Sequence, residues 1–130
     1  MKITSLDHLV LTVADPQATA TWYARVLGTE TEEFRPSDGS TRLALRFGAQ
    51  KINLHRKGAE FRPHAAVPAP GTADLCFLTD DPLDAWVAHL NAQDVAVEEG
   101  PVPRTGATGP ILSIYLRDPD GNLIEVSTRA

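Results

Sequence analysis

The chain has 130 residues, enough for one domain with a substantial core but not for two independent ones. Its 42% hydrophobic and 22% charged residues are ordinary values for a globular domain and exclude extensive disorder. The formal net charge of -5 argues against a nucleic-acid partner, which usually requires a basic face.

One cysteine, Cys76, is present, so no intrachain disulfide is expected and nothing indicates secretion. No stretch approaches the roughly 20 apolar residues of a membrane span, and the N-terminal residues do not have the pattern of a signal peptide. We therefore expect a cytoplasmic protein with neither a membrane nor a nucleic acid as partner.

The first half of the chain predicts a strand, a helix and three further strands. Apolar residues alternate in Ile3–Val13, which is typical of a strand with two different faces. Asp15 and Pro16 then provide a capping carboxylate and a first-turn proline for a helix that Gly28 ends. The strands predicted after this helix are Thr31–Arg35, Arg42–Phe47 and Lys51–Arg56.

The second half repeats this order. Alternation returns in Thr72–Leu78, and Asp81 and Pro82 open a second helix with one apolar stripe. An offset of 66 residues aligns Asp15 with Asp81, and it also aligns His8 with Asp74. The strands predicted after the second helix are Val95–Glu99, Ile111–Arg117 and Asn122–Thr128.

These elements predict an α+β fold made of two tandem βαβββ modules that form a curved mixed sheet around a cavity. We expect one domain over residues 1–130, with module one at about 1–60, a proline-rich linker at about 61–71 and module two at about 72–130. A single half with one helix on one sheet would leave the other sheet face bare, so the halves are modules rather than separately stable domains.

Alternation places four potential metal ligands on the inner faces of the strands: His8, His55, Asp74 and Glu125. Carboxylates among apolar neighbours are unfavourable unless they are paired. A divalent cation would stabilise ionised carboxylates and neutral imidazoles, and this mixed set of nitrogen and oxygen ligands suits Zn, Ni, Mn or Fe(II).

Simpler interpretations of the same residues remain open. His8 alone would more often be a hydrogen-bonded structural residue, and Asp74 could cap a turn. Glu125 could instead pair with Arg117 or Arg104. The repeat favours the metal, because His8 and Asp74 occupy equivalent places on equivalent strands.

Three further residues are candidates for binding a substrate. The glycine-rich segment Pro103–Pro110, expected to be a loop, carries Arg104 and Thr105, and an arginine there could clamp an anionic group. Tyr115 faces inward and could bond a substrate oxygen or simply fill the cavity.

The sequence resembles a known protein family. The layout, with His8 on the first strand and the run RDPDGNLIE at Arg117–Glu125, is similar to the vicinal-oxygen-chelate superfamily of glyoxalases, bleomycin-resistance proteins and ring-cleaving dioxygenases. The resemblance covers nearly the whole chain. Within it, Glu99–Tyr115 looks like the glyoxalase-domain-containing-protein-5 group, which includes bacterial relatives labelled virulence proteins.

The resemblance implies a divalent metal held by one residue on each of the first, fourth, fifth and eighth strands. Those positions are His8, either Asn53 or His55, then Asp74 and Glu125. The fifth-strand ligand is usually histidine in this family, so Asp74 is a departure. The resemblance also implies that Glu125, with Asp74 as second candidate, moves a proton in a glyoxalase-like reaction.

The leading functional hypothesis is therefore a metal-dependent glyoxalase-like lyase or isomerase that acts on a small substrate with vicinal oxygens. One alternative is a non-haem iron ring-cleaving dioxygenase that uses His8, His55 and Glu125, with Asp74 left over. Another is a metal-free ligand-binding or resistance protein. The family resemblance also implies a homodimer with shared sites.

Overall fold

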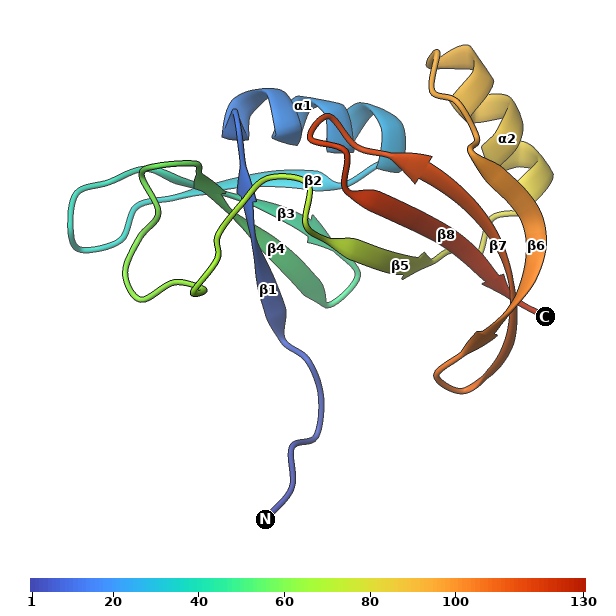
Figure 1. Cartoon of the computed structure of the whole chain (residues 1–130), viewed down its shortest axis with the longest axis horizontal. Coiled ribbons are helices and arrows are strands. Elements are labelled where there is room, and N and C mark those ends of the chain that lie inside the picture. Colours follow the sequence, from blue (N-terminus) through green and yellow to red (C-terminus); the bar gives the residue numbers. More distant parts are fainter. The chain divides into compact units, whose positions relative to one another are not determined.

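The computed structural model describes all 130 residues, which divide into two compact units, Met1–Pro70 and Gly71–Ala130. Each unit contains one helix and one four-stranded mixed sheet (Figure 1). The predicted α+β class and the doubled βαβββ order are confirmed. Neither helix is long and apolar enough to cross a membrane.

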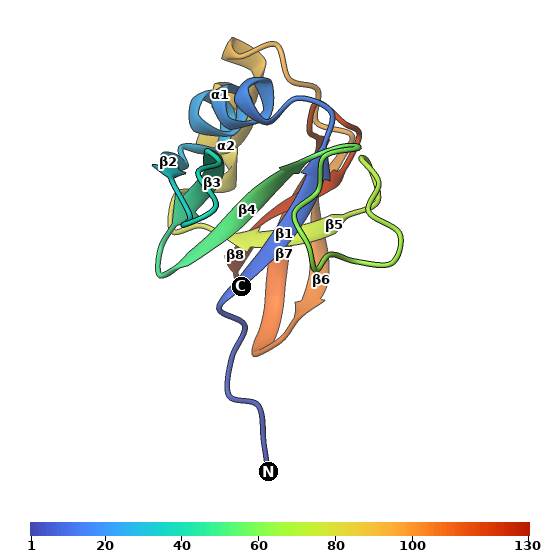
Figure 2. The ribbon, with the colours of Figure 1, turned by 90° about the vertical axis from the view of Figure 1, so that its left-hand side faces the viewer.

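The first unit consists of β1 (His8–Val13), α1 (Pro16–Leu27), β2 (Glu30–Phe34), β3 (Arg42–Phe47) and β4 (Gln50–Arg56). The strand order is β1-β4-β3-β2, and the first and last strands of the unit run side by side in parallel (Figure 2). The other pairs are antiparallel. Fully buried side chains from α1 and the sheet form the core of the unit: Val13, Tyr23, Val26, Leu45 and Ile52.

The second unit has the same topology. Its elements are β5 (Asp74–Leu78), α2 (Leu83–Ala92), β6 (Glu99–Gly106), β7 (Gly109–Arg117) and β8 (Leu123–Arg129). The order is β5-β8-β7-β6, with β5 and β8 parallel. Its core is formed by Leu90, Ile114, Leu116, Ile124 and Val126.

One strand prediction and one loop prediction were wrong. The strand predicted at Val95–Glu99 lies instead at Glu99–Gly106, and the segment Pro103–Pro110 is a hairpin rather than a loop. Prolines argue against a central strand because they lack an N–H, but β6 is an edge strand and tolerates them. At the N-terminus the first strand begins only at His8, so Leu6 lies outside it and is exposed.

The helix starts differ between the two units. The Asp15 carboxylate accepts from the backbone N–H groups of Gln17 and Ala18 at 3.1 and 3.2 Å, as predicted. The equivalent residue Asp81 does not cap α2, because that helix begins one position later and Pro82, with no side-chain hydrogen bond, stands at its N-cap. Asp15 and Asp81 are therefore equivalent in the sequence repeat, but only Asp15 caps a helix.

We expect Asp15→Ala to lower the free energy of unfolding by about 1 kcal/mol, because it leaves two N–H groups of α1 without their acceptor. The matched substitution Asp81→Ala should change it by less than about 0.5 kcal/mol. Urea denaturation followed by circular dichroism measures both, and equal losses for the two variants would contradict the difference in capping.

Candidate functional site

The register of β1 and β4 determines which side chains of the first unit lie close together. Val10 is opposite Asn53, and His8 is opposite Lys51. Asn53, two residues after Lys51, is thus a diagonal neighbour of His8. His55 is four residues after Lys51 and lies about 13 Å further along the strand than the level of His8. By backbone register, Asn53 therefore lies nearer to His8 than His55 does.

The register of β5 and β8 repeats this relation in the second unit. Cys76 is opposite Glu125, and Asp74 is opposite Leu123. Asp74 and Glu125 are therefore diagonal neighbours on one face, in the same way as His8 and Asn53. The two units place one such pair each at equivalent positions on their parallel strands.

His8 has one ring nitrogen hydrogen-bonded and the other available. Its Nδ1 lies 2.7 Å from Oδ2 of Asp7. The hydrogen bond from the His8 ring lowers the pKa of the Asp7 carboxyl below its ordinary value. Because a carboxylate accepts, Nδ1 carries the proton and Nε2 keeps its lone pair, which is the tautomer that binds a metal.

Asn53 is half-buried, and its Oδ1 is fully buried with no hydrogen-bond partner. A buried acceptor without a donor costs free energy, so its persistence beside His8 calls for an explanation. An amide oxygen is a suitable ligand for Mn, Fe(II) or another oxygen-binding cation, and it equally accepts from a substrate hydroxyl.

His55 lies in a different environment on the same strand. The residue is only 7% exposed, and its ring packs edge-on against Phe61 at 5.3 Å between centroids. Burial, followed by the charge of Arg42, lowers the pKa of His55 below its ordinary value. The ring is therefore neutral at physiological pH.

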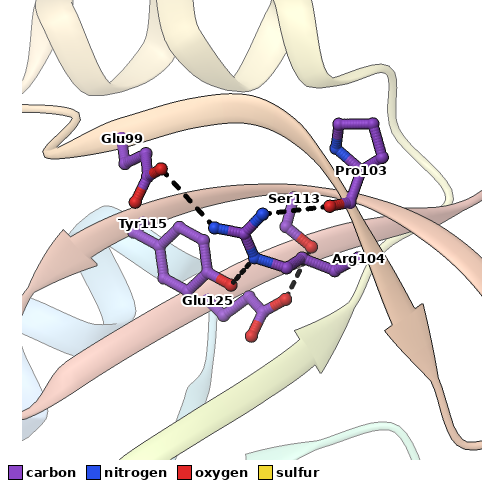
Figure 3. Close-up of polar contacts among 6 residues, drawn as sticks. All are labelled: Glu99, Pro103, Arg104, Ser113, Tyr115 and Glu125. Atoms are coloured by element: carbon purple, nitrogen blue, oxygen red, sulfur yellow. Dashed lines mark hydrogen bonds and ion pairs between the residues drawn. The ribbon is translucent and has the colours of Figure 1, made fainter.

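Glu125 is half-buried and held by hydroxyl groups rather than by an arginine (Figure 3). Ser113 Oγ donates to Glu125 Oε2 at 2.6 Å, and Ser127 Oγ lies 3.4 Å from the same oxygen. The two serines are fully buried and 2.7 Å apart. Both act on Oε2, which leaves Oε1 as the oxygen available to a ligand.

A cavity of about 320 Å³ lies beside Glu125 within the second unit. Its lining includes Cys76, Leu78 and Thr105, so the predicted substrate residue Thr105 and Glu125 border the same space. Partial burial of the thiol raises the pKa of Cys76, and the negative charge of Glu125 acts in the same direction. Cys76 therefore carries its proton at neutral pH.

Arg104 is held across the β6–β7 hairpin (Figure 3). Its Nε donates to the Tyr115 hydroxyl at 2.9 Å, one terminal nitrogen donates to the carbonyl of Pro103 at 3.0 Å, and the other lies 3.5 Å from Glu99. The bond to Tyr115 raises the pKa of Arg104 above its usual value. Since Tyr115 is opposite Glu125 in the sheet, the guanidinium is fixed on the same face as the carboxylate.

Neither arginine that the sequence offered as a partner of Glu125 forms that pair. Arg117 contacts Glu98, at 3.0 and 3.1 Å, and the carbonyl of Gly121. Arg104 is bound as described above. Glu125 therefore keeps a carboxylate oxygen free of any salt bridge, as a ligand or a base requires.

Three His, Cys, Asp or Glu side chains do not come together as a ready-made metal site in either unit. Each unit supplies a pair on its parallel strands, with an exposed Asp74 in one and a half-exposed His8 in the other.

Comparison with known proteins connects this geometry with a family. The sequence profile of the Glyoxalase/Bleomycin resistance protein/Dioxygenase superfamily matches residues 5–126. The chain belongs to this superfamily. The family resemblance seen in the sequence is thereby confirmed, together with its likeness to virulence-protein relatives.

Two similar members of the superfamily match almost the whole chain. Virulence protein STM3117 of Salmonella typhimurium is 53% identical over 127 residues, which are 98% of this chain and 85% of that protein. A solved structure from the mobile metagenome of V. Pseudocholerae is 55% identical with a TM-score of 0.94, covering 100% of this chain and 98% of that one.

More distant members have names that state an activity. An ethylmalonyl-CoA/methylmalonyl-CoA epimerase of Cereibacter sphaeroides is 30% identical over 93% of this chain and 95% of its own. The structure of a lactoylglutathione lyase from Agrobacterium tumefaciens is 25% identical with a TM-score of 0.71, covering 98% of this chain and 96% of that one.

The superfamily motif before Glu125 forms a structural clasp, a hydrogen-bonded turn that strand alternation does not predict. The buried carboxylate of Asp118 accepts from the backbone N–H groups of Asp120 and Asn122, each at 2.9 Å, and from the Asn122 side chain at 2.8 Å. Asn122 Oδ1 in turn accepts from the N–H of Ala73 at 2.9 Å. The clasp thus joins the chain at the starts of β5 and β8. Asp74 is the first residue of β5, and Glu125 is the third residue of β8.

We expect Asp118→Ala to lower the free energy of unfolding by about 3 kcal/mol, because it removes a buried acceptor of three hydrogen bonds. Asp38→Ala is the matched control, since Asp38 also accepts within a turn, from Ser40 and Arg42, but is exposed. Its cost should be about 1 kcal/mol or less. Urea denaturation of both variants tests this, and comparable losses would show that burial of the clasp is unimportant.

Proposed function

We propose that the protein is a divalent-metal-dependent lyase or isomerase of glyoxalase type, acting on a small substrate with two neighbouring oxygens. The observation that carries the proposal is the repeated diagonal pair, His8 with Asn53 and Asp74 with Glu125, at equivalent positions on the parallel strands of both units. The relatives named as an epimerase and as a lactoylglutathione lyase support it.

The residues present fit a divalent cation. His8 offers Nε2, Glu125 offers Oε1, and the buried Asn53 Oδ1 has no other partner. Together with the exposed Asp74 they would supply one nitrogen and three oxygen ligands. Such a set favours Mn, Fe(II), Ni or Zn over softer metals.

Choosing Asn53 as the fourth-strand ligand leaves His55 outside the site. A ring-cleaving dioxygenase of this family would use two histidines and one carboxylate, but the register separates His55 from His8 by about 13 Å along the sheet. The dioxygenase alternative is therefore less well supported than the lyase or isomerase.

A bound metal would supply Lewis-acid stabilisation to two neighbouring substrate oxygens. Glu125 is the proposed base that takes a proton from the carbon next to them and returns it. The Ser113 hydroxyl holds Oε2, so Oε1 would be the oxygen that takes the proton, which it could do only while it is not bound to the cation. Arg104, anchored on Tyr115, is placed to orient an anionic group of the substrate on the same face.

We expect the protein purified without chelator to contain close to one equivalent of a divalent metal per chain. Glu125→Gln should lower its affinity for that metal at least tenfold and abolish catalysed exchange of the substrate α-proton, because an amide is a weaker ligand and no base. Elemental analysis and proton exchange in heavy water, with the hemithioacetal of methylglyoxal and glutathione as first substrate, provide the measurements.

Glu33→Gln, which removes an exposed carboxylate of β2, should leave both quantities unchanged. Protein that contains less than about a tenth of an equivalent and gains no thermal stability from Zn, Mn, Ni or Fe(II) would refute the metal proposal. Full exchange activity in Glu125→Gln would remove this residue from the mechanism.

We further propose a homodimer with sites shared between chains. Leu6, Val10 and Leu78 are 62%, 45% and 52% exposed, and the proposed interface would cover part of this apolar surface. Light scattering should therefore give the mass of two chains. Mixing His8→Ala with Glu125→Ala chains should restore about a quarter of the wild-type activity, since only heterodimers regain one intact shared site. A monomer, or a mixture that remains inactive, would contradict this assembly.

A further inference from the structure

The cavity beside Glu125 extends along β8 to a second charged residue, Arg129. The two residues are four apart on the strand, so their side chains share a face and start about 13 Å apart along it. Among the residues that line the cavity, Glu125 is the only anion and Arg129 is the only cation. The cavity therefore has a carboxylate at one end and a guanidinium at the other.

Arg129 differs from the other arginines of the second unit because it forms no ion pair. Arg104 pairs with Glu99, and Arg117 pairs with Glu98. Arg129 is exposed and has no acidic partner. A guanidinium in this state is suited to bind the carboxylate of a ligand through two parallel hydrogen bonds.

Two hydroxyl groups lie at the Arg129 end of the cavity. Arg129 is opposite Ile111 in the sheet, and the preceding residue of β7, Pro110, is opposite Thr105. Thr105 and Thr108, both of the β6–β7 hairpin, line the cavity. Because a hydroxyl can donate to a carboxylate, this end can satisfy more of an anion's oxygen lone pairs than the arginine alone could.

The wall between the two ends is apolar. Leu78 of β5 is opposite Ser127, the residue midway between the two charged ends. Ile111 of β7 is opposite Arg129. Both apolar side chains line the cavity, and Leu78 is 52% exposed. A hydrocarbon chain that joins the two ends would bury this apolar surface, which favours binding.

A second arginine, Arg104, serves the Glu125 end. Arg104 and Arg129 start level with each other on β6 and β8. The Arg104 guanidinium, however, contacts Tyr115 and Glu99 (Figure 3). Both of these residues lie level with Glu125 in the sheet. The two guanidinium groups therefore lie toward opposite ends of this face.

We infer that the substrate is a small dicarboxylic acid with an oxygen on the carbon next to one carboxylate, and that Arg129 binds the other carboxylate. This inference rests on the proposed function, since the end with two neighbouring oxygens would lie at Glu125 and the metal. The separation of Glu125 and Arg129 selects a substrate with several carbons between its two ends. Arg129 is thus a residue that determines specificity for the length and the second charge of the substrate.

Two ligands of equal length provide the test. 2-Oxoadipate has the second carboxylate, and 2-oxohexanoate has a methyl group in its place. Both have the same oxo acid group, so the difference between their affinities measures the contribution of the second carboxylate alone. Isothermal titration calorimetry of the full-length protein as purified should give at least tenfold tighter binding of 2-oxoadipate, the effect of one charge-assisted pair.

Substitutions of Arg129 test the assigned contact. Arg129→Gln removes the charge and should bring the two affinities within about twofold of each other. Arg129→Lys keeps the charge but not the planar fork, so it should restore part of the preference for 2-oxoadipate. Arg25→Gln, which removes an exposed arginine of α1, should keep the full preference.

Equal affinity of the wild-type protein for the two ligands would overturn the inference, and so would an undiminished preference in Arg129→Gln. Absence of binding by 2-oxoadipate would overturn it as well. A protein that prefers 2-oxoadipate through Arg129 but holds no metal and exchanges no proton would refute the proposed function and not the role of Arg129. Metal content and proton exchange without this preference would refute the role of Arg129 alone.

Discussion

The parallel pairing of the first and last strand in each unit is the constraint on which the proposed site depends. Parallel strands cannot be joined by a tight turn, so residues some 45 to 50 positions apart in the sequence become neighbours. Once the register is set, Asn53 is the diagonal neighbour of His8, and Glu125 is that of Asp74. The buried clasp of Asp118 and Asn122 stabilises this arrangement where β5 and β8 begin.

Much of the fold could be predicted because strand alternation and helix signals are local. The spacing of 66 residues between His8 and Asp74 also appears in the structure, where these residues begin β1 and β5. Local patterns could not distinguish Asn53 from His55, since residues two apart on a strand share a face. Only the pairing with a strand some 40 residues away separates them, and no periodicity encodes that register.

The hydrogen-bond partners of Glu125 could not be predicted from the sequence for a related reason. Its charge suggested Arg104 or Arg117 as a partner. The carboxylate is instead held by Ser113 and Ser127, a cross-strand pair on the same face of the sheet, two residues along from Glu125. The sequence pattern of a strand does not indicate that a serine in it will be buried beside a carboxylate. The capping of α2 was likewise obscured, because Asp81 and Pro82 match Asp15 and Pro16 in type while the helix begins a residue later.

The prolines that obscured β6 in the sequence have a consequence for the behaviour of the protein in concentrated solution. Pro101 and Pro103 stand in a strand at the free edge of the second sheet, where each lacks the N–H that an incoming strand would bind. At the corresponding edge of the first sheet, β2 presents Glu30, Glu32 and Glu33. The β6 and β2 edges therefore resist the addition of strands from other molecules.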